Sequence, residues 1–178
     1  MRPMMEYIKN TEKTGMIGGE IGAWEGEHSQ DILINLGDRI KSFYVIDPYE
    51  EYTCRVGKHY TQERVDKSYS IMLHRLRKFG KGKLKVIRKR SVDAILDITE
   101  DFDFIYIDGD HTYENVVKDL NLYWDKTKLG GIFGGDDYHN DTHLGVTKAI
   151  DEFVEDKNLI LNVGLDRDKK IYDWWIVK

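Results

Sequence analysis

The sequence contains little cysteine and little proline. Its 178 residues include one cysteine, Cys54, and two prolines. A single thiol cannot form an internal disulfide, so a reducing, cytoplasmic environment is the natural expectation. We find no Pro/Gly/Ser-rich linker, no internal repeat and no low-complexity tract. The length suits one domain with a full core, and we expect a single domain over residues 1–178.

Long apolar runs and an excess of positive charge are also absent. No window approaches the roughly 18 apolar residues of a membrane span, and the first ten residues lack the apolar core of a signal peptide. The formal net charge is −5, so the whole molecule lacks the electrostatic footprint of a nucleic-acid-binding protein. These absences favour a cytoplasmic protein that has no membrane partner.

The two common phosphate-binding motifs are missing as well. The stretch EIGAWEG at residues 20–26 spaces its glycines as G-x-x-x-G, not as the G-x-G-x-x-G of dinucleotide sites. No Lys-Ser/Thr pair follows it, which excludes a P-loop. Glu20 and Glu25 would repel a pyrophosphate but attract a cationic ligand. An NAD-dependent dehydrogenase is therefore disfavoured.

Short apolar runs alternate with helical patterns along the chain. Strands are expected at 16–21, 42–47, 84–89, 102–108, 130–136, 159–164 and 171–177. Helices are expected at 29–40, 61–79, 91–98, 112–124 and 145–156. Ser29 and Ser91 are the expected caps of the helices that they begin. The last two strands are separated by only a turn, so they should pair antiparallel.

Alternation of this kind predicts an α/β fold, a largely parallel sheet with helices on both faces. Ligands of such folds bind outside the carboxyl ends of the strands. Four expected strands end in an acid, namely Glu20, Asp47, Asp108 and Asp136. A single acid could simply stabilise the start of the next helix. Four of them fit that explanation poorly, because Ser, Thr or Asn would cap equally well.

The glycine turn and the next acid indicate the kind of ligand. Glycine lets the backbone turn tightly and approach a ligand closely. Asp47 ends its strand 21 residues after Gly26, where an acid can accept hydrogen bonds from both hydroxyls of a ribose. A glycine turn with acids and a ribose-binding aspartate points to an adenosyl ligand without phosphates. S-adenosylmethionine fits that description.

At these residues the sequence resembles the class I S-adenosylmethionine-dependent methyltransferases. EIGAWEG (20–26) resembles the first motif of that family, and VIDP (45–48) resembles the second. IYIDGDHTYENVVKDL (105–120) and LGGIFGGDDY (129–138) are similar to a narrower branch, related to the caffeoyl-coenzyme A, catechol and macrolide-sugar O-methyltransferases. The resemblance covers roughly residues 16 to 155. It implies a Rossmann-like, doubly wound, seven-stranded sheet in the order 3-2-1-4-5-7-6, with strand 7 antiparallel.

The resemblance also implies which residues contact the cofactor. Glu20, Gly22 and Gly26 would border its methionine end with Ser29 beside them, Asp47 would hold the ribose, Ser91 and Val92 would lie against the adenine, and Asp108 and Asp110 would lie near the cofactor.

A divalent metal is implied next to the cofactor, held by Asp108, Asp136 and Asp137. With the implied strand order these carboxylates converge, and they cannot all stay ionised without a counter-charge. All-oxygen ligation suits Mg²⁺, Mn²⁺ or Ca²⁺, and we expect Mg²⁺. The alternative is a solvated acidic loop without a metal role.

A histidine falls where the catechol branch has a catalytic lysine. An imidazole titrates near neutral pH, so His111 is the predicted general base, and Asp108 would take part in catalysis through the metal. The alternative is that His111 only braces the helix that starts at Thr112. His139 and His143 are also near in sequence, and with His111 they keep Mn²⁺, Fe²⁺ or Zn²⁺ open.

The predicted function is a metal-assisted methyl transfer to a hydroxyl of a small molecule such as a sugar or a phenol. The loop 48–61, with Tyr49, Tyr52, His59 and Tyr60, is a candidate cover for that substrate.

Two other classes of function stay open. One is a non-catalytic cofactor-binding module. The other is a nucleic-acid-modifying or nucleic-acid-binding protein that uses the basic stretch 75–90, although such a run is more typical of a solvated helix end and a lysine-guarded edge strand. A homodimer is a further hypothesis.

Overall fold

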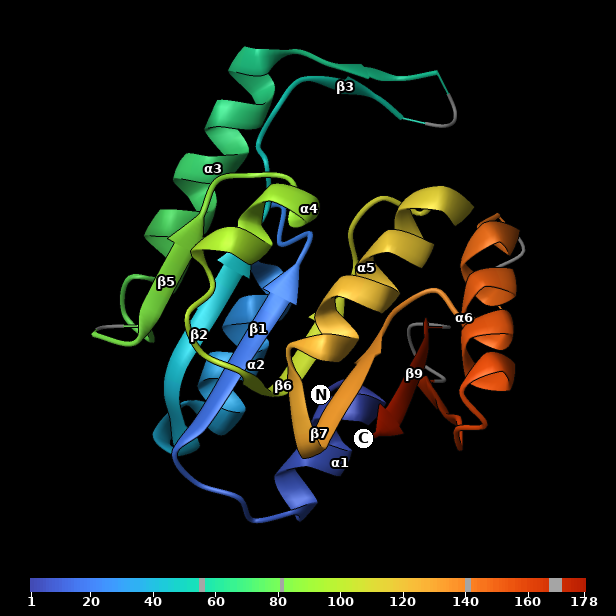
Figure 1. Ribbon diagram of the computed structural model, residues 1–178. Helices are drawn as coiled ribbons and strands as arrows, with labels where there is room; N and C mark the ends of the chain where they lie inside the picture. Colours follow the sequence, from blue (N-terminus) through green and yellow to red (C-terminus); the bar gives the residue numbers. More distant parts are fainter. Residues whose placement is uncertain (55–56, 81, 140–141, 167–170) are drawn as a thin grey trace.

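The computed structural model describes residues 1–54, 57–80, 82–139, 142–166 and 171–178. A seven-stranded sheet lies at its centre, with helices on both faces (Figure 1). Its strands are β1 (Met16–Ile21), β2 (Ile40–Ile46), β5 (Leu84–Ile87), β6 (Phe102–Ile107), β7 (Thr127–Gly135), β8 (Asn162–Asp166) and β9 (Ile171–Val177). They are arranged as β5-β2-β1-β6-β7-β9-β8, and β9 is antiparallel to both neighbours. Numbered within this sheet, the order is 3-2-1-4-5-7-6, which confirms the predicted fold class.

Six α-helices are found in the described residues. They are α1 (Pro3–Asn10), α2 (Glu27–Leu36), α3 (Gln62–Leu76), α4 (Ser91–Ala94), α5 (Tyr113–Asp125) and α6 (Leu144–Asp156). The first three cover one face of the sheet and the last three cover the other (Figure 1). Within the described part of the chain, no helix is both long enough and apolar enough to cross a membrane.

The central strand β6 shows why its sequence is an almost continuous apolar run. Phe104 and Tyr106 pack with the residues of α1, α2 and α3. Ile105 and Ile107 point to the other face and pack with α5 and α6. A strand that is covered on both faces has no solvent-facing positions, so polar residues do not alternate with apolar ones.

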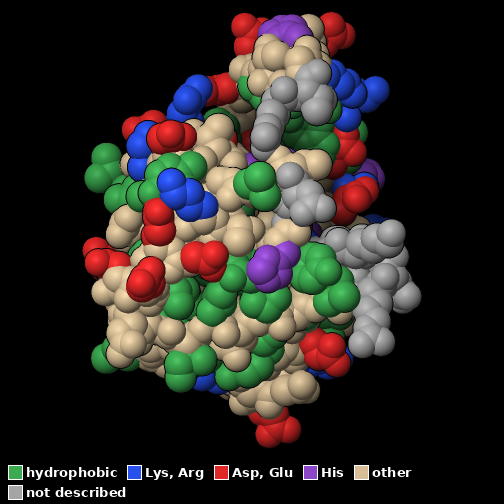
Figure 2. All heavy atoms as spheres, turned by 90° about the vertical axis from the view of Figure 1, so that its right-hand side faces the viewer, with side chains coloured by type: hydrophobic (Ala, Val, Ile, Leu, Met, Phe, Trp, Pro, Cys, Tyr) green, Lys and Arg blue, Asp and Glu red, His purple; other side chains and the backbone are tan. Residues whose placement is uncertain are grey.

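Two elements were not expected from the sequence. Helix α1 begins at Pro3, a residue favoured at the first helical position, and buries Met4, Met5 and Ile8. Its eight residues are shorter than the window over which helical periodicity becomes clear. A small antiparallel hairpin, β3 (Tyr52–Thr53) and β4 (His59–Tyr60), lies within the predicted loop 48–61. Figure 2 shows that it projects from the top of the molecule.

Both predicted serine caps are wrong. Helix α2 begins two residues before Ser29, at Glu27, and its N-cap is Gly26 with φ +76°. Ser29 is buried inside the helix. Helix α4 begins at Ser91 itself, so that the N-cap is Arg90.

Some predicted bounds also shift. The helix at 61–79 ends at Leu76, the strand at 130–136 begins at Thr127, and the strand at 159–164 occupies Asn162–Asp166. Helix and strand ends depend on caps and on pairing partners, which the periodicity of the sequence does not reveal.

Candidate active site at the carboxyl edge of the sheet

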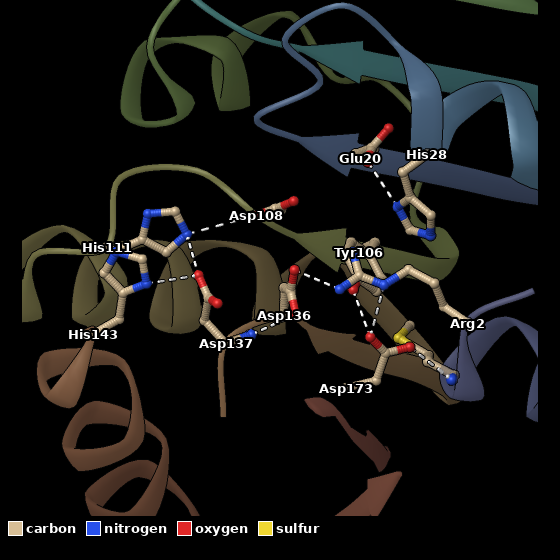
Figure 3. Close-up of polar contacts among 11 residues, drawn as sticks. Arg2, Glu20, His28, Tyr106, Asp108, His111, Asp136, Asp137, His143 and Asp173 are labelled. Carbon is tan, nitrogen blue, oxygen red and sulfur yellow. Dashed lines mark hydrogen bonds and ion pairs between the residues drawn. The ribbon is translucent and has the colours of Figure 1, made fainter. Parts of the chain in front are cut away.

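Parallel pairing brings the predicted acids to one edge of the sheet. Glu20 lies one residue before the end of β1, and Asp47, Asp108 and Asp136 directly follow β2, β6 and β7. The register places Ile107 beside Gly135, so Asp108 and Asp136 leave neighbouring strands side by side. Figure 3 shows the side chains that gather there.

The three predicted metal ligands meet at this edge. One oxygen from each of Asp108, Asp136 and Asp137 lies within 4.8 Å of the others. Asp137 adopts φ +62°, and its backbone N–H donates to Oδ1 of Asp136 at 2.7 Å. An aspartate tolerates this left-handed conformation better than most residues, and here it directs two consecutive carboxylates to one place. The arrangement can hold a divalent ion, and the binding of that ion stays a prediction.

His111 lies between two of these carboxylates. Its Nε2 is 2.7 Å from Oδ2 of Asp137 and 3.4 Å from Oδ1 of Asp108. Burial alone would lower the pKa of His111, but its hydrogen bonds and ion pairs with the two aspartates outweigh burial and raise the pKa to about 10. Burial raises the pKa of Asp108 to about 6, although the hydrogen bond from His111 opposes this rise. The imidazolium therefore supplies one counter-charge to the acids.

A second imidazole shares the Asp137 carboxylate. His143, just before α6, places Nδ1 3.0 Å from the same Oδ2 of Asp137. The rings of His111 and His143 are stacked, with centroids 4.3 Å apart and an interplanar angle of 14°. The third histidine of this region, His139, packs its ring against Tyr138 instead.

Arg2 completes the other side of the acid cluster and was not found by sequence reasoning. Its guanidinium pairs with Oδ2 of Asp136, and its Nε lies 3.0 Å from Oδ1 of Asp173 (Figure 3). The same Asp173 oxygen accepts a hydrogen bond from the Tyr106 hydroxyl at 2.7 Å. Arg2 and Asp173 are both buried. No local pattern connects residue 2 with residues 136 and 173, so only the fold reveals this network.

Glu20 forms a second polar cluster at the end of β1. It is 1% exposed, lies 2.8 Å from Nδ1 of His28 and accepts a hydrogen bond from the Ser29 hydroxyl. His28 was also missed, because a histidine in the first turn of a helix has no distinctive spacing. The two partners hold the Glu20 carboxylate in one orientation.

Gly22 and Gly26 of the turn are in close contact with other parts of the protein itself. Gly22 has φ +84°, and a Cβ on it would lie 1.9 Å from the backbone oxygen of Asp108. Gly26 has φ +76°, and its Cβ would lie 2.9 Å from Cγ of Met72. Glycine is thus required at both positions by the approach of β6 and α3, whatever ligand binds the turn.

Asp47 stands at the end of β2, next to this turn. Its carboxylate accepts hydrogen bonds from the backbone N–H groups of Trp24, at 2.9 Å, and Tyr49, at 3.0 Å. Burial raises its pKa, against the effect of these two bonds. Each carboxylate oxygen has two acceptor sites, so Asp47 keeps the capacity to bind ribose hydroxyls.

Of the remaining predicted cofactor residues, Ser91 and Val92 lie on α4, and Asp110 precedes α5. The backbone oxygen of Ser91 accepts a hydrogen bond from the Tyr123 hydroxyl, and Val92 is 39% exposed. Asp110 accepts hydrogen bonds from the backbone N–H of Thr112 and from the Asn115 side chain, at 2.8 and 2.9 Å. Asp110 therefore has a clear structural role in starting α5.

Comparison with known proteins shows the family to which the chain belongs. A model of the family described as methyltransferase domain matches residues 20–138, about two thirds of the chain. The chain belongs to this family and carries its methyltransferase domain.

The individual proteins that resemble this chain share less than a third of their aligned residues with it. An uncharacterized protein of Acanthamoeba polyphaga mimivirus is 29% identical over 142 residues, which are 77% of this chain and 58% of that protein. The chain thus spans under two thirds of the length of this relative. A putative rRNA methylase structure from Clostridium thermocellum superposes with a TM-score of 0.70 and 15% identity, covering 98% of this chain and 94% of that one. An O-methyltransferase from Bacillus cereus in complex with SAH gives 0.67 and 14%, with 98% and 79% covered. At these identities the two structures show a shared fold.

Proposed function

We propose that the protein transfers a methyl group from S-adenosylmethionine to a hydroxyl of a small molecule, a sugar or a phenol, with the help of a divalent metal. The convergence of the Asp108, Asp136 and Asp137 carboxylates beside the cofactor edge carries this proposal. Three clustered carboxylates suit a divalent ion, and such an ion can bind and activate an acceptor hydroxyl. The structural likeness to O-methyltransferases is consistent with the proposal.

The donor set at the edge suits the proposed cofactor. Asp47 would accept hydrogen bonds from the ribose, and Glu20, held by His28 and Ser29, would attract the positively charged methionine end. Ser91 and Val92 would border the adenine. When bound, the sulfonium supplies the methyl group to an acceptor oxygen.

The acid cluster and His111 would prepare that oxygen. A divalent ion held by Asp108, Asp136 and Asp137 would lower the pKa of the acceptor hydroxyl and orient it. His111 would take the hydroxyl proton at Nε2. It must be neutral to do so, and its pKa of about 10 reflects the two unneutralised aspartates beside it. A divalent ion held by these carboxylates would offset their negative charge, which would lower the pKa of His111 and allow it to act as a base.

The hairpin supplies an aromatic surface for the acceptor. The rings of Tyr52 and Tyr60 are stacked at 4.9 Å, and Trp24 from the glycine turn meets Tyr60 edge-on at 5.4 Å. Such rings can pack against a sugar or a phenol. Tyr49, which was predicted to belong to the substrate cover, is not part of this surface. It is 1% exposed, and its hydroxyl donates a hydrogen bond to the backbone oxygen of Trp24.

The basic stretch 75–90 does not favour the nucleic-acid alternative. Five of its cations lie beside carboxylates, in the pairs Arg75–Glu27, Lys85–Glu100, Arg88–Asp66, Lys89–Asp97 and Arg90–Glu50. Cations that are already paired with acids have less charge to offer to phosphates.

Thermal unfolding with S-adenosylhomocysteine tests the cofactor half of the proposal. At about 100 times its dissociation constant the ligand should stabilise the protein by roughly 2.7 kcal/mol, a shift of several degrees. NAD⁺ and ATP should give no shift. Asp47→Ala should abolish the response, whereas Asp125→Asn, an exposed aspartate at the end of α5, should retain it. Equal shifts for wild type and Asp47→Ala would remove Asp47 from the site.

Turnover of a hydroxylated acceptor tests the metal half. We expect activity to be lost in EDTA and restored by Mg²⁺, and Asp137→Asn to lose activity while it still binds S-adenosylhomocysteine. Unchanged turnover in EDTA would overturn the metal role. Cofactor binding without turnover of any acceptor would favour the non-catalytic module.

A further inference from the structure

A second set of candidate ligands adjoins the three carboxylates and differs from them in chemistry. Nε2 of His111, Nδ1 of His143 and one Asp137 oxygen lie within 4.8 Å of one another. Both nitrogens face the same oxygen, at 2.7 and 3.0 Å. Figure 3 shows the two rings side by side next to Asp137, with a further dashed line from His111 to Asp108.

We call His111, His143 and Asp137 the histidine set, and Asp108, Asp136 and Asp137 the carboxylate set. The two sets differ in the surroundings of Asp136, which belongs only to the carboxylate set. One Asp136 oxygen is paired with Arg2, and the other accepts the backbone N–H of Asp137. A divalent ion bound to Asp136 must therefore share it with a buried guanidinium, whose positive charge opposes the ion. The histidine set lies on the far side of Asp137 from Arg2 (Figure 3).

We infer that His111, His143 and Asp137 form a binding site for a transition-metal ion such as Co²⁺, Ni²⁺ or Zn²⁺. Two imidazoles and one carboxylate favour these ions, whereas three carboxylates favour Mg²⁺ or Ca²⁺. Two consequences follow from the shared residues. An ion at the histidine set uses Asp137, so it competes with an ion at the carboxylates. It also occupies Nε2 of His111, so it blocks the proposed base.

This inference goes beyond the proposed function, because it needs neither the cofactor nor methyl transfer. In the context of that function, the site would make the enzyme sensitive to inhibition by transition metals.

Cobalt titration of tag-free, full-length protein tests the site without any assay of activity. Co²⁺ binding is followed by visible absorption, which reports nitrogen ligation, and by calorimetry. His143→Asn and, separately, His111→Asn should each weaken Co²⁺ binding at least about tenfold. His139→Asn, from the same loop but outside the set, is the matched control and should bind Co²⁺ like the wild type. Asp136→Asn should also retain the nitrogen-ligated spectrum.

Each outcome distinguishes Co²⁺ binding at His111, His143 and Asp137 from Co²⁺ binding at the three carboxylates. Loss of Co²⁺ binding in both His143→Asn and His111→Asn, with His139→Asn unaffected, supports the site. Wild-type affinity in His143→Asn overturns it, and so does a loss of Co²⁺ binding in Asp136→Asn alone. Far-UV circular dichroism and thermal unfolding of the same variants confirm that they are folded. A wild-type protein that binds Co²⁺ but not S-adenosylhomocysteine would contradict the proposed function and leave this inference intact.

Discussion

Asp119 is a buried carboxylate that the proposed chemistry does not use. It lies on α5 at 3% exposure, and among the described residues its Oδ1 has no hydrogen-bond partner. Burial raises its pKa to about 6, although a hydrogen bond from Ser91 opposes this rise. The ordinary pKa of an aspartate is about 3.9. The folded protein therefore binds this proton more tightly than the unfolded chain does, and the contribution of Asp119 to stability falls as the pH rises from about 4 to about 6.

Asp119→Asn should remove this dependence on pH. A difference of about two pKa units corresponds to roughly 3 kcal/mol. We expect the free energy of unfolding of the variant minus that of the wild type to be larger by about 3 kcal/mol at pH 7 than at pH 3.5, so that the variant gains stability relative to the wild type as the pH rises. Urea unfolding at the two pH values measures it, with Asp125→Asn as the exposed control. A difference that is the same at both pH values would mean that Asp119 titrates normally.

Besides its buried apolar residues, helix α1 is bound at each of its two ends by one arginine. Arg2 joins the start of the helix to Asp136 and Asp173, and the Met4 N–H donates to Asp173 at 3.0 Å. At the other end, Arg39 donates to the backbone oxygens of Ile8 and Lys9 at 3.0 Å. The first contact pairs buried charges, whereas the second satisfies the neutral carbonyl groups that end the helix.

Arg2→Met should be the more damaging of two matched changes. It leaves the buried Asp173 without its counter-charge, so we expect a loss of about 3–5 kcal/mol in urea unfolding. Arg39→Met removes hydrogen bonds to neutral acceptors and should reduce stability by about 1–2 kcal/mol. Adding Asp173→Asn to Arg2→Met should recover part of the loss. Equal losses for the two arginine variants would contradict a buried ion pair at the start of α1.

The whole molecule is built as two cores that share one sheet. Ile105 of β6 belongs to the core under α5 and α6. The next residue of the strand, Tyr106, points to the opposite face and belongs to the core under α1 and α2. Neither core can lose its packing without exposing the sheet that the other core also needs. The molecule should therefore unfold in a single cooperative step.

Tryptophan fluorescence can report the two cores separately. Trp124 and Trp174 contact one core, and Trp24 and Trp175 contact the other. In a Trp24→Phe/Trp175→Phe variant and in a Trp124→Phe/Trp174→Phe variant, the urea midpoint from fluorescence should equal the midpoint from far-UV circular dichroism. An earlier fluorescence transition in either variant would reveal a core that melts independently.

Regular patterns explain which features the sequence could predict. The run FDFIYID predicted β6 because apolar residues on both faces of a strand are a strong local signal, and strand–helix alternation predicted the parallel sheet. The glycine spacing of residues 20–26 is unsuited to phosphates, and Asp47 follows β2. Together they pointed to the cofactor class. The eight residues of α1 and the two-residue strands of the hairpin were too short to give such a signal.

The sequence by itself determined the fold class, the family and the edge of the sheet to which the acids belong, because these depend on periodicity and on short motifs. Only the tertiary structure decided the partners of those acids. Arg2 reaches Asp136 and Asp173 across more than 130 residues, and His143 joins His111 at Asp137 only because α5 and α6 lie side by side. Contacts between residues that are distant in the chain depend on how the elements pack, and no local pattern encodes them.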